Sequence, residues 1–167
     1  MKVVVLAIGR PALLFRDAIL EYERRAAHYW TLDVIEVKEE KAGRNLPPER
    51  VRAVEADRLL ERVPPGLEVF ALTRTGEAWS SERLAQHLQQ RALASHPGTA
   101  FLIGGAFGLG ETALAQATRR LSLSAFTLPH ELARLFLAEQ LYRAGSIARG
   151  EPYHKAVQKR ESRGQLE

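Results

Sequence analysis

Apolar runs and helically spaced apolar residues divide this chain into alternating strands and helices. The run at residues 3–8 is continuous and ends at a glycine, which is typical of a strand buried on both faces. After Pro11, apolar residues that include Phe15, Ala18 and Ile19 recur at helical spacing and predict a helix with one core stripe. Further strands are predicted at residues 32–37, 67–73, 99–103 and 121–124, and further helices from residue 48, at 81–93 and at 130–147.

This alternation predicts an α/β fold with a mostly parallel sheet and helices on both faces. The strand at residues 32–37 alternates apolar and polar positions, so it is expected nearer an edge. Residues 1–155 are predicted to form a single domain, and residues 156–167 a basic C-terminal tail that is a candidate for disorder. The charged segment at residues 38–50 contains a glycine and two prolines and is the best candidate for a mobile loop.

Composition narrows the class of protein without identifying it. The chain has 167 residues, 46% hydrophobic and 26% charged, which is ordinary for a one-domain globular protein. It contains no cysteine, which excludes disulfides and thiolate metal sites, and no apolar run long enough to span a membrane. It begins with an apolar strand rather than a signal peptide, so a cytoplasmic location is expected.

The net charge of +4 gives modest support for an anionic partner. Residues 149–163 carry five lysines and arginines against two glutamates. This segment is either a solvated basic tail or a contact for nucleic acid, and its charge does not decide between the two.

A glycine-rich segment that contains Gly104, Gly105 and Gly108 follows the predicted strand at residues 99–103. Glycine permits a positive φ and lets the backbone approach a ligand closely. The segment therefore fits either a tight turn without a ligand or a ligand-binding loop. A phosphate loop is disfavoured, because the lysine and hydroxyl residue of a P-loop and the spacing of a dinucleotide fingerprint are both missing.

Three segments at predicted strand ends would meet at one edge of the sheet. They are Leu72–Thr73, Gly104–Gly105 and residues 124–128. In open α/β sheets, ligands bind beyond the carboxyl ends of the strands. Backbone groups and small side chains dominate these ends, which suits a ligand with an apolar or aromatic body, such as an adenosine compound.

The helix predicted at residues 130–147 is apolar on two sides and is therefore expected between two layers. One stripe contains Leu132, Leu135 and Phe136, and the other contains Ala133, Leu137, Leu141 and Ala144. In a chain this short, a partner subunit could supply the second layer. Glu139 and Arg143, four residues apart, fit either a structural ion pair or an arginine held in place for a substrate.

The histidines form no set that is typical of a hydrolase or a metal site. Three are interpreted as surface residues without partners: His28, His87 and His96. His130 is interpreted as a residue that helps to close its loop. His154, between Tyr153 and Lys155, fits either solvent-facing sequence or a base, an aromatic stacker and a phosphate contact brought together.

Three strings of residues resemble those of a known family. They are FLIGGAFGL at 101–109, LSLSAFTLPHELARLFLAEQLYRAGSI at 121–147 and PYHK at 152–155. The chain resembles the RlmH-type large-subunit ribosomal RNA methyltransferases of the SPOUT superfamily, with weaker agreement over essentially its whole length. This resemblance implies an α/β fold with a C-terminal trefoil knot, a homodimer, S-adenosylmethionine as methyl donor, and no metal. The implied acceptor is N3 of a pseudouridine in the 23S rRNA of the ribosome.

The resemblance also implies roles for individual residues. The implied cofactor contacts are Leu72, Thr73, Gly104, Gly105, Leu123, Ser124, Ala125, Phe126, Thr127, Leu128 and Pro129. His154 is the hypothetical general base. Arg143 would stabilise the anionic ring of the acceptor nucleobase, and Tyr153 would pack on that nucleobase. Lys155 and Arg149 are the implied RNA contacts. The helix at residues 130–147 would form the dimer interface, across which these groups could reach the RNA site.

This chain departs from the family pattern at three places. Phe107 stands where the family usually has an acid, so any role of that acid is absent. Gly145 stands where a tryptophan is usual, which is expected to loosen the end of the helix. Lys155 replaces an arginine and keeps its charge without the bidentate fork, and twelve residues follow it.

Two other functions stay open on the sequence. A ribosome-binding homodimer that has lost catalysis would keep the basic surface without needing a cofactor, although the intact loop at residues 121–129 argues against it. A methyltransferase for another RNA position, or for tRNA, would use the same cofactor pocket.

Overall fold

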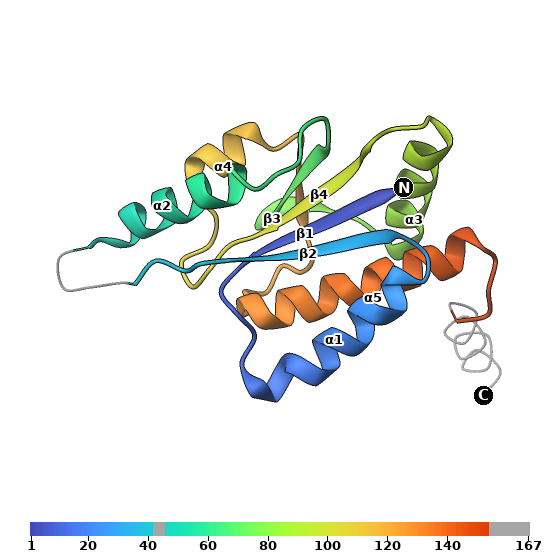
Figure 1. Cartoon of the computed structure of the whole chain (residues 1–167), viewed down its shortest axis with the longest axis horizontal. Coiled ribbons are helices and arrows are strands. Elements are labelled where there is room, and N and C mark those ends of the chain that lie inside the picture. The colour runs from blue at the N-terminus through green and yellow to red at the C-terminus, as the bar shows by residue number, and fades with distance from the viewer. Residues whose placement is uncertain (42–45, 154–167) are drawn as a thin grey trace, which may run out of the picture.

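The computed structural model describes residues 1–41 and 46–153, and in them one parallel sheet carries five helices (Figure 1). The strands are β1 Lys2–Ile8, β2 Thr31–Val37, β3 Glu68–Ala78, β4 Gly98–Ile103 and β5 Arg119–Ser122. The helices are α1 Leu13–Ala27, α2 Pro48–Leu60, α3 Ser81–Leu93, α4 Glu111–Gln116 and α5 His130–Ala148. The strand order is β2-β1-β4-β3-β5, and every neighbouring pair is parallel. The predicted α/β class and the edge position of β2 are confirmed.

Helices cover both faces of the sheet, as predicted. Because successive side chains of a strand point to opposite faces, β1 contributes to two cores. Val3 and Val5 pack in the core on the side of α1, α3 and α5. Val4 and Leu6 pack in the other core, on the side of α2 and α4. Figure 1 shows α2 and α4 on one side of the sheet and α1 and α5 on the other.

The predicted helix boundaries hold at α2 and α3 and are wrong at α1. Ser80 caps α3, because its Oγ accepts the N–H of Arg83 at 3.2 Å. Helix α1 begins at Leu13 rather than Pro11, with Ala12 as its N-cap. Its core stripe is also wrong at Ala18, which is exposed.

Strand β3 is longer than predicted, because it resumes pairing with β5 after an interruption. Both Leu72 and Glu77 pair with Leu121, so residues 73–76 bulge out of the ladder. A Cβ at Gly76 would lie 2.6 Å from the carbonyl carbon of Leu121, so only glycine fits there. The local sequence Arg-Thr-Gly is typical of a turn, and it conceals the tertiary pairing that continues the strand.

Strand β5 lies two residues earlier than predicted. It ends at Ser122, whose Oγ lies within hydrogen-bond distance of the carbonyl oxygens of Arg74, at 3.1 Å, and Ser124, at 3.0 Å. These contacts turn the chain away from the sheet. Leu123 and Ser124 therefore belong to the loop that leads to α5.

Candidate active site

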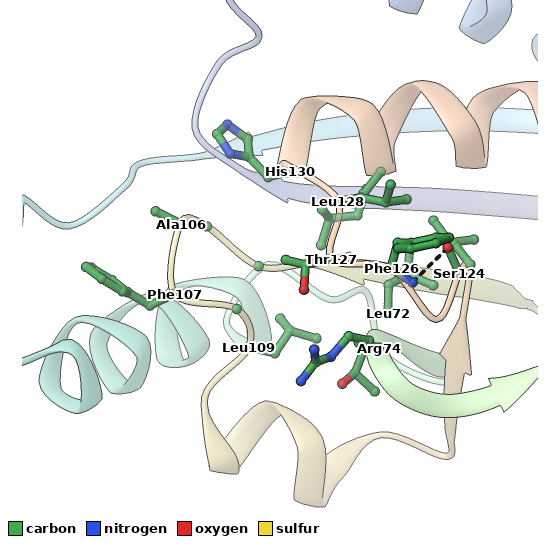
Figure 2. A pocket seen from close by; sticks show the side chains of 17 residues that line it. Leu72, Arg74, Ala106, Phe107, Leu109, Ser124, Phe126, Thr127, Leu128 and His130 are labelled. Atoms are coloured by element: carbon green, nitrogen blue, oxygen red, sulfur yellow. Dashed lines mark hydrogen bonds between the residues drawn. The ribbon is translucent and has the colours of Figure 1, made fainter.

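A cavity of about 360 Å³ opens at the carboxyl ends of β3, β4 and β5 (Figure 2). Its volume lies in the range of small-molecule sites, roughly 300–1,000 Å³. Three segments build it: the bulge of β3, the loop between β4 and α4, and the loop between β5 and α5. Its lining residues are Leu72, Thr73, Arg74, Ile103, Gly104, Gly105, Ala106, Phe107, Gly108, Leu109, Leu123, Ser124, Phe126, Thr127, Leu128, His130 and Ala133.

The cavity brings together most of the residues expected to contact a cofactor. Of that set, Ala125 and Pro129 are exposed and do not line it. Pro129 instead forms the N-cap of α5. The roles of the lining residues stay a prediction.

Glycine shapes the loop between β4 and α4. A Cβ at Gly104 would lie 2.5 Å from the carbonyl carbon of Gly108. The N–H of Gly108 donates to the carbonyl of Gly105 at 3.0 Å, and Gly108 has a φ of +80°. The segment is thus a tight turn, and the same turn forms one wall of the cavity.

A buried carboxylate lies behind this wall. A Cβ at Gly105 would lie 2.8 Å from Oε2 of Glu55, which is 4% exposed. The other oxygen of Glu55 accepts the N–H of Glu40 at 3.0 Å. Burial raises the pKa of Glu55 above its ordinary value. A side chain at Gly105 would have to displace Glu55 and Ile8, so the backbone of Gly105 forms the surface that faces the cavity.

The loop between β5 and α5 forms the opposite wall. The N–H of Phe126 donates to Oγ of Ser124 at 3.0 Å, which fixes a turn at the rim. Phe126 is 82% exposed, and its ring lies beside Ser124 in Figure 2. A large apolar side chain at the mouth of a cavity is suited to contact a ligand.

An ion cluster anchors the helix that follows this loop. Arg134 of α5 is 5% exposed and donates to Glu23 of α1 at 2.7 Å and to Glu36 of β2 at 2.9 Å. Burial opposes the charge of Arg134, but these carboxylates outweigh it and raise its pKa. One turn earlier, Glu131 accepts the N–H of Ala12 at 3.0 Å. The start of α5 is therefore held against α1 and β2.

Two lining residues with polar side chains were missed by the sequence analysis as ligand contacts. Arg74 lies in the bulge, which the predicted strand end at Thr73 excluded. The sequence pattern predicts only that His130 helps to close its loop, but His130 also lines the cavity. The signal for His130 was available, because it directly follows the expected cofactor loop.

The structure places Arg143 and Tyr153 away from this cavity. Arg143 lies thirteen residues beyond His130 on α5, which corresponds to about 20 Å along the helix. Its guanidinium pairs with Glu139 at 2.5 Å and lies 4.7 Å from the ring centroid of Tyr153. The Tyr153 hydroxyl donates to Glu139 at 3.1 Å. Within one chain, these groups form their own cluster at the far end of α5.

Tyr153 is held in its neutral form in this cluster. Burial and the carboxylate of Glu139 raise the pKa of Tyr153 to about 12.

Some predicted residues lie outside the described part of the chain. These are His154, Lys155, residues 156–167 and the central part of the proposed mobile loop, residues 42–45. Arg149 is exposed at the end of α5, with its guanidinium 4.8 Å from the ring centroid of Tyr29.

The flanks of α5 are partly covered by the chain itself, since α5 packs against both α1 and α3. Leu132 and Leu135 are half-buried, and Phe136 remains 42% exposed. At Gly145, the ring of Tyr29 occupies the place where a side chain would extend. Tyr29 thus fills the space beside Gly145, which is buried, and the effect of this glycine on the helix end stays a prediction.

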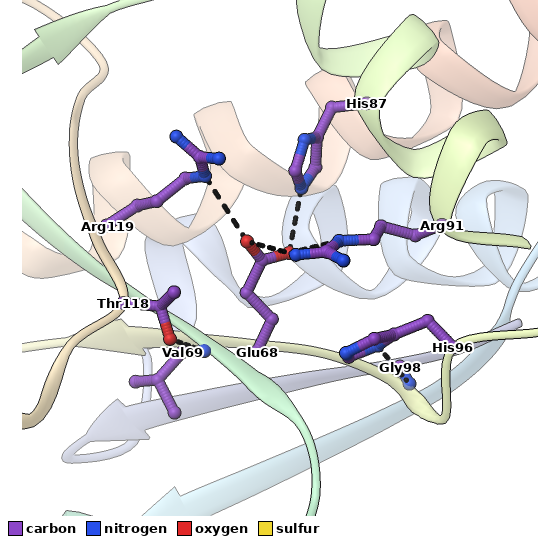
Figure 3. Close-up of polar contacts among 8 residues, drawn as sticks. All are labelled: Glu68, Val69, His87, Arg91, His96, Gly98, Thr118 and Arg119. Atoms are coloured by element: carbon purple, nitrogen blue, oxygen red, sulfur yellow. Dashed lines mark hydrogen bonds and ion pairs between the residues drawn. The ribbon is translucent and has the colours of Figure 1, made fainter. Parts of the chain in front are cut away.

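A second polar cluster lies at the opposite, amino end of β3 (Figure 3). Glu68, with a side chain 2% exposed, accepts from His87 at 2.8 Å, Arg91 at 3.0 Å and Arg119 at 3.2 Å. His87 also packs edge-on against Phe70. The interpretation of His87 as a surface residue without a partner is therefore wrong. His87 lies on the side of α3 that faces the sheet. The apolar pattern of α3 gives no sign that a charged residue of β3 will lie beside it.

We expect Glu68→Gln to destabilise the protein by about 2 kcal/mol at neutral pH, because three donors lose their anionic partner. Burial raises the pKa of Glu68, but hydrogen bonds from Arg91 and His87 outweigh it and lower this pKa to about 2. A depressed pKa stabilises the fold above the ordinary value of 4.5, and this contribution is lost as the pH falls toward 2.

Urea unfolding between pH 7 and pH 2.5 measures this contribution to the free energy of unfolding. The gap between wild type and variant should narrow below pH 4.5, whereas the exposed Glu61→Gln should behave as wild type. A gap that does not change with pH would contradict this account.

Two classes of site are not found in the part of the chain that the structure describes. None of the helices there is long and apolar enough to cross a membrane. No group of three or more histidine, cysteine or acidic residues there is placed to hold a metal ion.

Comparison with known proteins identifies the family. A family model described as a predicted SPOUT methyltransferase matches residues 1–154. Ribosomal RNA large subunit methyltransferase H of Gemmatimonas aurantiaca is 54% identical over 156 residues, which cover 93% of this chain and all of the relative. The enzyme of the same name from Rhodospirillum rubrum is 52% identical over 161 residues, with 93% of this chain and all of the relative covered.

A solved structure shows the same fold at low sequence identity. A probable methylase family protein from Haemophilus influenzae is 13% identical, with a TM-score of 0.50, and the match covers 91% of this chain and 69% of that one. The sequence matches extend over nearly the whole chain, including all three segments around the cavity. This chain therefore belongs to the SPOUT methyltransferase family, among relatives of ribosomal RNA large subunit methyltransferase H.

Proposed function

We propose that this protein is an S-adenosylmethionine-dependent methyltransferase that modifies N3 of a pseudouridine in the 23S rRNA of the large ribosomal subunit. One observation carries the proposal: two of the family-like strings, at residues 101–109 and 121–147, meet the bulge of β3 around one cavity at the strand ends. The names of the close relatives supply the substrate class, large-subunit rRNA.

The cavity suits the cofactor in its shape and chemistry. Gly104 and Gly105 present bare backbone: a Cβ at Gly104 would meet the backbone of Gly108, and one at Gly105 would lie 2.8 Å from the buried carboxylate of Glu55. Ile103, Leu109 and Leu128 supply apolar walls for an adenine ring. The loops around these walls supply main-chain groups for hydrogen bonds. When bound, S-adenosylmethionine supplies an electrophilic methyl group on its sulfonium.

The protein must also position the acceptor and remove a proton from it. N3 of pseudouridine is an imide N–H and becomes a good nucleophile only after it loses this proton. We assign removal of this proton to His154 and stabilisation of the resulting anion to Arg143. Tyr153 would pack on the pseudouridine ring. Lys155 and Arg149 would contact the RNA backbone.

Arg143 and Tyr153 can serve the cavity only in a dimer. Arg143 lies about 20 Å along α5 from His130, too far to reach its own cavity. In a two-fold dimer with antiparallel α5 helices, the far end of one helix would lie beside the start of the other. We therefore propose a homodimer in which each cavity is completed by the partner. The single domain at residues 1–155 and the trefoil knot stay predictions.

Binding and product analysis test the proposed function separately. We expect S-adenosylhomocysteine to bind the purified protein in calorimetry, and the protein to methylate large ribosomal subunits from cells that lack this modification. Mass spectrometry of the digested rRNA then locates the methyl group. Absence of cofactor binding would leave a ribosome-binding protein without catalysis. A methyl group on another nucleotide would replace the proposed acceptor and keep the chemistry.

A further inference from the structure

The bulge in β3 brings one arginine to the cavity. Residues 73–76 leave the ladder between the two pairs made by Leu121, and bulges of this kind re-aim side chains beside active sites. Arg74 lies in this bulge and lines the cavity. In Figure 2 its guanidinium extends from β3 toward Leu109.

The backbone of the bulge is held from two sides. The buried hydroxyl of Ser122 lies 3.1 Å from the carbonyl oxygen of Arg74. Gly76 packs against the backbone of Arg120 and Leu121, without room for a Cβ. The sheet itself therefore fixes where the Arg74 side chain begins, which favours a binding role over chance exposure.

The charge of Arg74 is not neutralised by its surroundings. Among the described residues that line the cavity, Arg74 is the only lysine or arginine, and none of them is acidic. Within residues 1–41 and 46–153, its side chain forms no ion pair or hydrogen bond. An unpaired guanidinium beside an apolar cavity favours a ligand with an anionic group at that end.

We propose that Arg74 binds the carboxylate of the methionine part of S-adenosylmethionine, an inference that rests on the proposed function. This carboxylate is the only anionic group of the cofactor, and the planar guanidinium can bind it with two parallel hydrogen bonds. The apolar walls would hold the adenosine, and Arg74 would hold the opposite end. Arg74 is thereby a determinant of which adenosine compounds the cavity accepts.

A comparison of two ligands isolates this contact. S-adenosylhomocysteine carries the carboxylate, whereas 5′-methylthioadenosine keeps the adenosine and the thioether without it. We expect Arg74→Gln to weaken S-adenosylhomocysteine binding about 10- to 100-fold in calorimetry and to leave 5′-methylthioadenosine binding unchanged. Arg74→Lys should fall between, because it keeps the charge and loses the fork. Arg62→Gln removes an exposed charge after α2 and should bind both ligands as wild type does.

Each other outcome overturns the proposal in a distinct way. Unchanged S-adenosylhomocysteine binding by Arg74→Gln, with weaker and less salt-dependent rRNA binding, would make Arg74 a phosphate contact. An equal loss of both ligands would show that Arg74 maintains the shape of the cavity. If the wild-type protein bound neither ligand, the proposed function would fail first.

Discussion

Replacing Gly104 by alanine is expected to lower S-adenosylhomocysteine affinity at least about 100-fold, because the new methyl group must displace a wall of the cavity. The added Cβ would lie 2.5 Å from the carbonyl carbon of Gly108 and 2.7 Å from the nitrogen of Leu109. Backbone atoms cannot move aside as the end of a flexible side chain can. The loop would therefore shift as a unit, and with it the backbone groups expected to contact the cofactor.

Calorimetry with S-adenosylhomocysteine measures this loss, and thermal unfolding measures its cost in stability. We expect the stability to fall by about 1–3 kcal/mol, so that the variant still folds. Ala92→Ser is the control, since Ala92 is exposed near the end of α3 and lies outside the cavity lining. A folded Gly104→Ala protein that binds S-adenosylhomocysteine as wild type does would show that this loop is a turn without a ligand.

The sequence predicts the part of this site that local patterns encode. An apolar run that ends in glycines predicts a buried strand and the loop after it, and Gly104 and Gly105 do lie at the cavity. The order of the strands comes from pairing between distant segments, and no local pattern carries it. The bulge at Arg74 is an instance, because the strand resumes only through contacts with residues 121–122.

Buried charge is the second feature that the patterns miss. Reading a helix or strand by its apolar pattern treats a charged residue as exposed, yet Glu23 and Arg134 on helices and Glu68 on β3 are all buried. Each is buried with a partner of opposite charge from another element. The position of Arg143 is a third feature that the sequence does not predict. Arg143 belongs to the same family-like string as the loop between β5 and α5, but it lies near the other end of α5 from the cavity.

If the proposed homodimer forms, that distance leads to the second large effect, which is complementation between two inactive variants. We expect Gly104→Ala to lose the cofactor and Arg143→Ala to keep it while methylation falls about 100- to 1,000-fold. Neither homodimer should methylate rRNA. In a mixed dimer, the Arg143→Ala chain supplies an intact cavity and the Gly104→Ala chain an intact far end of α5. One complete site results, with about half the activity of the wild-type dimer.

The reciprocal dimer makes the test decisive. Here one chain carries both substitutions and its partner is wild type, so the two dimers have the same composition and differ only in arrangement. If each cavity is completed by the partner, the wild-type cavity faces a damaged helix end, the wild-type helix end faces a damaged cavity, and activity is lost. If each chain were complete in itself, this dimer would keep half of the activity and the first would have none. Differently tagged chains, purified by two affinity steps, allow both dimers to be assayed. The two architectures thus predict opposite results, and the 20 Å between His130 and Arg143 favours the shared site.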